Sequence, residues 1–332
     1  MPLLRIKATD LRLQLHRQSG AWREAVRATD VTAGPAIIMV HGFKYAPESA
    51  THCPHEKIFA MRAGGWPTAL GFYGYPKTEG LGIAFGWYAR GSLWQVHRRA
   101  AHLGRMLADL VIRLRDAAPE RPVHVIAHSM GSEIALSALE FLPPQAIRRM
   151  ILLTGASYAS RAQTALITPA GQTSEVFNVI SRENDLFDLA FERLVPAPKP
   201  RDRAVGQGID RQNVLNLQLD CPQTLSILDG LGLPVAAARR RVCHWSSYTR
   251  PGVMAFYAKL LRDPDHLPQA RLAQLLPRDT SPRWSRLMKA PAAMSRAPLT
   301  LPDLAATARV LRAKTGFLPP APPARKHNEP VC

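Results

Sequence analysis

One short segment of the sequence has the residue types that a nucleophilic serine requires. The segment is Ala127-His128-Ser129-Met130-Gly131, and it directly follows Val123, His124, Val125 and Ile126, which read as a buried strand. Small residues two before and two after a serine suit a sharp turn from a strand to a helix, in which the serine backbone is strained. At the N-terminus of that helix, the dipole and the free N–H groups stabilise developing negative charge. The segment therefore predicts that Ser129 attacks an electrophilic carbon such as an acyl carbonyl.

A second segment has the composition of a turn that binds an oxyanion. The apolar run Ala36–Val40 is followed by His41, Gly42 and Phe43. Because glycine has no Cβ, the backbone at Gly42 can pass close to a substrate carbonyl. The alternative is that His41 and Gly42 only end a strand.

These two segments resemble the α/β-hydrolase superfamily, and bacterial esterase-like and lipase-like hydrolases in particular. Residues 127–131 resemble its nucleophile elbow, although Ala127 stands where glycine is more common. Residues 41–43 resemble the segment after its third strand. The resemblance implies that Ser129 is the nucleophile and that the backbone N–H groups of Phe43 and Met130 form the oxyanion hole.

In that superfamily the acid follows the serine along the chain and precedes the histidine. The resemblance implies that Asp185 is the acid, because it lies in a short acidic segment after the predicted strand Val176–Ser181. Glu183 and Asp188 are its rivals for this role. Asp188 can equally be a solvated or capping carboxylate of a following helix.

Two histidines lie beyond the acid candidates, His244 and His266. His244 is surrounded by apolar and aromatic residues and precedes a predicted helix from Gly252 to Leu261. His266 lies in a polar, proline-containing turn. We therefore expect His244 to be the general base of a Ser129–His244–Asp185 triad.

The elements that must position these residues alternate between strands and helices. A helix from Leu93 to Arg115 is predicted by apolar residues spaced three and four apart. This alternation is typical of a mostly parallel sheet with helices on both faces, and it leaves no room for a large cap domain. The predicted strands are Leu3–Ala8, Leu11–His16, Ala36–Val40, Ala69–Tyr73, Val123–Ala127, Met150–Thr154 and Val176–Ser181, and a further helix is predicted over Ser132–Leu142.

The composition changes after residue 262. We expect residues 1–262 to form an α/β-hydrolase catalytic domain. Residues 263–332 are rich in Pro, Ala and Arg, and we expect them to form a basic, partly disordered C-terminal extension.

The chain of 332 residues has 43 Lys and Arg against 25 Asp and Glu, a formal net charge of +18. The charge is spread along the chain without interleaved aromatic residues, so we expect no nucleic-acid partner. The basic extension allows a weak contact with an anionic membrane. No run without charged residues reaches the roughly 18–20 residues of a membrane-spanning helix, and the N-terminus has no apolar signal segment, so a cytoplasmic location is expected.

Other candidate sites are weaker. The four cysteines, Cys53, Cys221, Cys243 and Cys332, have no C-x-x-C spacing. The segment His52–Glu56 contains residue types that bind metals, but the sequence has no second group of such residues to complete a site. Gly80–Gly86 is glycine-spaced but lacks the partner residues of a nucleotide site. We therefore expect neither a metal nor a cofactor.

The first functional hypothesis is a serine hydrolase of carboxylic esters, acting on a small-molecule or lipid-like ester through an acyl-enzyme. An acyltransferase or a thioesterase would use the same triad. A non-catalytic hydrolase-fold protein that binds a membrane or a partner is the alternative from another class. The oligomeric state stays open.

Overall fold

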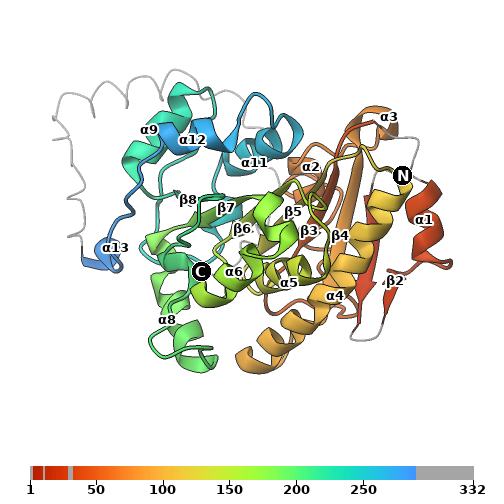
Figure 1. The fold of residues 1–332 in the computed structure, drawn as a ribbon, viewed down its shortest axis with the longest axis horizontal. Coiled ribbons are helices and arrows are strands. Elements are labelled where there is room, and N and C mark those ends of the chain that lie inside the picture. Colours follow the sequence, from red (N-terminus) through yellow and green to blue (C-terminus); the bar gives the residue numbers. More distant parts are fainter. Residues whose placement is uncertain (1–2, 10–11, 29–32, 289–332) are drawn as a thin grey trace, which may run out of the picture. The chain divides into compact units, whose positions relative to one another are not determined.

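A computed structural model describes residues 3–9, 12–28 and 33–288 (Figure 1). Its central sheet has eight strands in the order β2-β1-β4-β3-β5-β6-β7-β8. Only β1 and β2 pair antiparallel, and every other neighbouring pair is parallel. The predicted mostly parallel α/β sheet is confirmed. Its strands are β1 (Leu3–Ala8), β2 (Leu13–Leu15), β3 (Ala36–Val40), β4 (Leu81–Trp87), β5 (Val123–His128), β6 (Arg149–Leu153), β7 (Glu175–Ile180) and β8 (Val214–Gln218).

Helices cover both faces of the sheet, because the side chains of a strand point alternately to its two faces. In β3, Ile38 packs in a core cluster with residues of α1, α4 and α5, whereas its neighbours Ile37 and Met39 pack with residues of α2, α9, α11 and α12. The helices are α1 (Trp22–Ala28), α2 (Trp66–Ala69), α3 (Pro76–Glu79), α4 (Leu93–Ala117), α5 (Gly131–Ala138), α6 (Ala159–Leu166), α7 (Pro169–Thr173), α8 (Asp185–Leu194), α9 (Pro222–Gly230), α10 (Ser246–Thr249), α11 (Val253–Arg262), α12 (Gln269–Leu275) and α13 (Ser285–Met288), with short 3₁₀ turns η1 (Leu139–Phe141), η2 (Arg182–Asn184) and η3 (Val205–Gln207).

One predicted strand is wrong. The run 69–73 is not a strand: Ala69 ends α2, and the buried Leu70 and Phe72 in the turn after it fill the core. The strand of this region is β4. Gly82 and Gly86 lower its apparent strand propensity, so the sequence pattern does not predict it. Both glycines are closely packed, because a Cβ at Gly86 would lie 2.5 Å from Nε2 of His55 and one at Gly82 would make a tight contact of 3.1 Å with the Leu3 side chain.

The compact unit that carries the sheet spans Met1–Arg286 and so continues past residue 262. Arg149, 1% exposed at the start of β6, donates hydrogen bonds to the carbonyl oxygens of Leu260, Pro264 and Leu267. Leu272 of α12 is fully buried. These contacts attach the first part of the proposed extension to the sheet. Leu287–Cys332 belong to a second unit, and residues 289–332 lie outside the described residues.

Candidate active site

Ser129 lies in a strained turn between β5 and α5. Its φ of 54° falls in the left-handed region that side chains with a Cβ rarely adopt. The turn is fixed from both sides, because the Ser129 N–H donates to Leu153 O (3.0 Å) and its carbonyl oxygen accepts from the Ala156 N–H (3.0 Å). A Cβ at Gly131 would lie only 2.6 Å from His41 O, so the residue two after the serine has to be glycine. This is the strand-to-helix turn that the sequence predicts.

His41 holds the turn that follows β3. Its Nε2 accepts a hydrogen bond from the Trp87 N–H (3.0 Å), so the ring proton is on Nδ1. Nδ1–H therefore donates to Gly42 O at 2.8 Å. Burial lowers the pKa of His41 to about 3, which keeps the ring neutral. In a trans peptide the C=O and the following N–H point in opposite directions, so the Phe43 N–H points away from His41.

The two turns meet at Gly42. A Cβ built on this residue would lie 2.7 Å from Cβ of Ser129 and 2.9 Å from Nδ1 of His128. Within the described residues, neither the Phe43 N–H nor the Met130 N–H donates a hydrogen bond. The structure thus presents two unused backbone donors on the turns that flank the serine.

His244 is oriented by an amide and not by a carboxylate. Its Nδ1 lies 2.6 Å from Oδ1 of Asn184, the last residue of η2. The Asn184 Nδ2–H donates to Oδ1 of Asp188 at 2.8 Å, which turns the amide oxygen toward the imidazole. His244 therefore carries its proton on Nδ1, and its Nε2 is left as the basic nitrogen.

The carboxylate of Asp185 has other partners. Its Oδ1 pairs with Arg182 Nη1 at 3.2 Å, and its Oδ2 accepts the Trp284 N–H at 2.7 Å. We expect Asp185 beside His244 from the sequence, but the structure does not bring these two residues together. Because Asp185 begins α8, its side chain leaves the backbone in a different direction from that of Asn184. A one-residue difference decides which group meets the imidazole.

The two rival acids also have defined places. Glu183 pairs with the buried Arg250 and accepts from the Ser181 hydroxyl, so it has a structural role at the β7 end. Asp188 accepts a hydrogen bond from the Asn184 amide, and within the described residues no hydrogen bond joins it to His244. Burial, followed by the charge of Asp185, raises the pKa of Asp188 to about 8. The buried carboxyl therefore holds a proton at neutral pH.

Aromatic rings pack against His244, which is half-buried. Phe187 stacks on the imidazole at 4.8 Å, and the His128 ring lies 4.6 Å away. The His244 carbonyl oxygen accepts from the Thr154 hydroxyl at 3.3 Å. Burial, and then His128, lower the pKa of His244 well below its usual range. The ring is therefore a neutral base across the physiological range.

Ser129 is itself only 4% exposed. In the described part of the chain its hydroxyl has no hydrogen bond to His244, and such bonds often tighten only when substrate is bound. Two cavities lie away from Ser129. One of about 750 Å³ borders β2, and one of about 620 Å³ lies at the amino ends of β3 and β5, the opposite edge of the sheet.

The family model of the alpha/beta hydrolase fold matches residues 80–192, which include Ser129, Asn184 and Asp188. With the eight-stranded sheet and the strained serine turn, this match decides the fold. The chain has an α/β-hydrolase fold. No curated protein matches it. Among the described residues of this hydrolase-fold chain, no helix has the length and apolar character to cross a bilayer.

In this α/β-hydrolase fold the helix after the serine is fixed by a buried carboxylate. Glu133 of α5, 1% exposed, pairs with Arg161 of α6 at 3.1 Å and with His97 of α4 at 3.4 Å, and it accepts from the Ser157 hydroxyl. Burial opposes its ionisation, but these partners outweigh burial and lower the pKa of Glu133 to about 2. The charged network keeps α5 in place beneath Ser129.

Sequence reasoning missed Asn184 as a site residue of this hydrolase fold. Asparagine has no charge to mark it as a triad member, and an acid stands directly after it at position 185. The available signal was its position at the end of β7, where the third member of a triad is expected.

Proposed function

We propose that this α/β-hydrolase-fold protein hydrolyses carboxylic esters, with Ser129 as the nucleophile and His244 as the general base. The observation that carries the proposal is the strained Ser129 backbone, which lies against Gly42 with two unused N–H donors on the flanking turns. A serine in this geometry is suited to attack a carbonyl whose oxygen becomes negative.

The reaction follows from these positions. The Ser129 hydroxyl attacks the ester carbonyl while Nε2 of His244 accepts its proton. The N–H groups of Phe43 and Met130 bind the oxyanion of the tetrahedral intermediate. The imidazolium then gives its proton to the leaving alcohol, and an acyl-enzyme remains. Water attacks the acyl-enzyme in the same way and releases the acid.

Asn184 replaces the usual acid in this scheme. An amide oxygen holds the Nδ1–H tautomer of His244, as asparagine does in Cys-His-Asn proteases, but it adds no negative charge. Asp188 accepts from the Asn184 amide and so prevents the amide from turning its N–H groups toward the ring. We infer that Asp188 is a positioning residue and that it acts only through Asn184.

The surroundings of the base support an apolar acyl group. Phe187, Trp245 and Tyr248 lie around His244 and His128. With Ser129 almost fully buried, little water surrounds the reacting atoms, and interactions with the oxyanion become stronger. We therefore propose a small apolar or aromatic acyl ester as the substrate class.

Labelling with a fluorophosphonate probe tests the assignment. The native chain and Ser19→Ala, a control at an exposed serine, should be labelled equally, and Ser129→Ala should not be labelled. Hydrolysis of short p-nitrophenyl esters should fall at least about 10³-fold in Ser129→Ala. Equal labelling of Ser129→Ala and the native chain, or no labelling of the native chain, would overturn the proposal.

A further inference from the structure

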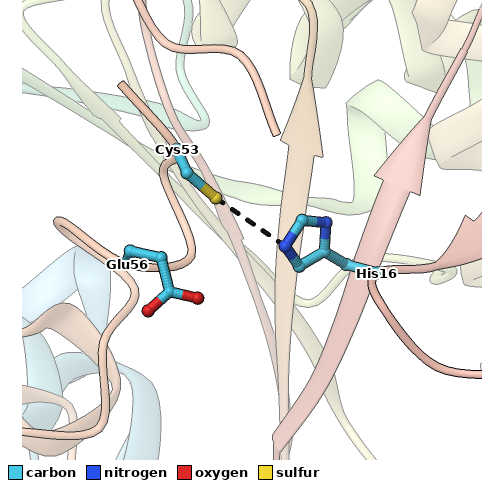
Figure 2. Close-up of side chains that lie close together, drawn as sticks. All are labelled: His16, Cys53 and Glu56. Atoms are coloured by element: carbon cyan, nitrogen blue, oxygen red, sulfur yellow. Dashed lines mark hydrogen bonds between the residues drawn. The ribbon is translucent and has the colours of Figure 1, made fainter. Parts of the chain in front are cut away.

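A second cluster of reactive side chains lies where the end of β2 meets the loop after β3. His16 directly follows β2, and Cys53 and Glu56 come from that loop (Figure 2). One donor atom of each residue lies within 4.8 Å of the other two. Figure 2 shows the imidazole of His16 and the thiol of Cys53 facing each other, with the carboxylate of Glu56 beside them. None of the three belongs to the proposed catalytic site.

The spacing of the two buried donors matches a tetrahedral ion. Nε2 of His16 lies 3.7 Å from Sγ of Cys53. Zinc bonds of about 2.3 Å to sulfur and about 2.0–2.1 Å to nitrogen place two tetrahedral ligands about 3.6 Å apart. An ion therefore fits between these atoms with almost no change in their positions.

We propose that His16, Cys53 and Glu56 bind one Zn²⁺ ion, with a fourth position open to water. A thiolate, an imidazole and a carboxylate together suit Zn²⁺ better than the hard cations Mg²⁺ and Ca²⁺, which prefer oxygen. The Cys53 thiol loses its proton to solvent on binding. The thiolate and the carboxylate then balance the charge of the ion.

The surroundings bury two of the ligands and leave the third at the surface. His16 is 3% exposed and Cys53 is 1% exposed, and the ring of His55 stacks on His16 at 4.2 Å. Nε2 of His55 faces Gly86, where a Cβ would meet it at 2.5 Å, and His55 is not among the residues whose donor atoms lie within 4.8 Å of one another. Glu56 is exposed and can complete the site from the surface.

Two arginines compete with the ion for Glu56. Arg17 lies 3.3 Å and Arg5 lies 4.0 Å from Oε1 of Glu56. Both contacts use the same oxygen, and the carboxylate has a second oxygen for the ion. The cavity of about 750 Å³ that His16 and Arg17 line gives an ion an open approach.

In the sequence, the segment His52–Glu56 lacks a second group of metal-ligand residues. In the fold, His16 provides the additional ligand. His16 is 37 residues from Cys53, and the sheet brings it there because it follows β2, which pairs with β1. A bound ion would link the end of β2 to the loop after β3. We therefore expect zinc to stabilise this part of the fold and to leave the chemistry of Ser129 unchanged.

Zinc titration of the full-length chain tests the site. After removal of metals with a chelator, the chain is titrated with Zn²⁺ in competition with a chromophoric chelator. The native chain should bind one Zn²⁺, and Cys53→Ser and His16→Gln should each bind it at least tenfold more weakly. Glu56→Gln, an exposed change that leaves folding intact, should also weaken binding, whereas Cys221→Ser, a cysteine outside the cluster, should not.

Co²⁺ gives a direct reading of the ligand set. With Co²⁺ the native chain and Cys221→Ser should show a thiolate-to-cobalt charge-transfer band, and Cys53→Ser should not. Absence of zinc binding to the native chain, equal binding by Cys53→Ser, or cobalt binding without the thiolate band would each overturn the proposal. Ser129→Ala should bind zinc like the native chain, which separates this test from that of the hydrolase reaction.

Discussion

Nδ1 of His244 lies 2.6 Å from the amide oxygen of Asn184, while the neighbouring carboxylate of Asp185 faces Arg182 and the backbone of Trp284. The group that orients the base is therefore neutral. A triad usually holds a negative charge next to the imidazole. Here that charge is on Asp185, one residue along the chain, and it pairs with Arg182. Both side chains of this ion pair are 1% exposed.

The first prediction separates these two residues. Asn184→Ala should lower kcat by about 10²–10⁴-fold, because the Nδ1–H tautomer of His244 loses its acceptor. Asn184→Asp should keep most of the activity, because its carboxylate can accept the same hydrogen bond from the His244 Nδ1–H. Steady-state hydrolysis of a p-nitrophenyl ester measures both effects.

Asp185→Asn is the matched control for this prediction. It should leave kcat nearly unchanged and should reduce the free energy of unfolding by about 3 kcal/mol, because the buried Arg182 loses its charged partner. Urea unfolding measures that loss. A severe loss of kcat in Asp185→Asn together with an active Asn184→Ala would return the acid role to Asp185.

The second prediction concerns the buried carboxyl of Asp188, whose pKa is raised from 3.8 to about 8. Its contribution to stability is fully present below pH 3.8, where the carboxyl is protonated in both states. Between pH 3.8 and 8 the unfolded chain loses this proton and the folded chain keeps it, so stability falls as pH rises. A single proton gives a slope of at most about 1.4 kcal/mol per pH unit.

Asp188→Asn should remove this slope, because the amide does not titrate. Urea unfolding of the native chain and of the variant at intervals between pH 4 and 8 measures the difference. The native chain should lose stability relative to the variant as pH rises. Parallel curves would show that Asp188 does not keep its proton in the folded protein.

The sequence was sufficient wherever the chemistry depends on neighbouring residues. The turn around Ser129 and the turn at Gly42 each follow from small residues next to an apolar strand. The choice between Asn184 and Asp185 depends on where α8 begins, on the i,i+3 pairing of Arg182 with Asp185 and on the distant backbone of Trp284, and the sequence pattern alone does not show which of them forms. The pairing of His16 with Cys53 depends on the sheet, which brings together residues that are distant in sequence.

The glycines of β4 show a different limit. Gly82 and Gly86 reduce the apparent strand propensity of a segment that is buried along its whole length. The close contact of Gly86 with His55 explains glycine at that position, and Gly82 is packed tightly against Leu3 and Phe72. Those contacts come from residues far away in the sequence, so composition alone favours the neighbouring run 69–73.

The third prediction concerns the pH dependence of hydrolysis. The base must be neutral, so activity is lost as pH falls through the pKa of His244, which burial lowers well below 6.5. The acidic limb of kcat/KM should therefore lie below pH 6.5. Phe187→Ala exposes the imidazole to water and should move the limb up toward that value, whereas Leu186→Ala, at an exposed neighbour, should not. A limb at or above pH 6.5 in the native chain would contradict the burial of a neutral base.

The fourth prediction tests the contact between the two turns. A Cβ on Gly42 would lie 2.7 Å from Cβ of Ser129, well inside the separation of about 3.5–4.0 Å at which carbon atoms pack. In Gly42→Ala the backbone has to move, and the Phe43 N–H moves with it. Loss of one oxyanion donor costs about 10²–10³-fold in kcat, and we expect a loss of at least this size.

Gly230→Ala is the matched control for Gly42→Ala. A Cβ on Gly230, the last residue of α9, meets nothing within 4 Å, so this variant should keep the native kcat and the native rate of labelling by a fluorophosphonate. Circular dichroism would check that Gly42→Ala stays folded. If a folded Gly42→Ala hydrolysed the ester as fast as Gly230→Ala, the turn after β3 would not supply an oxyanion donor, because a displacement of this size at Phe43 has to weaken any hydrogen bond made there in the transition state.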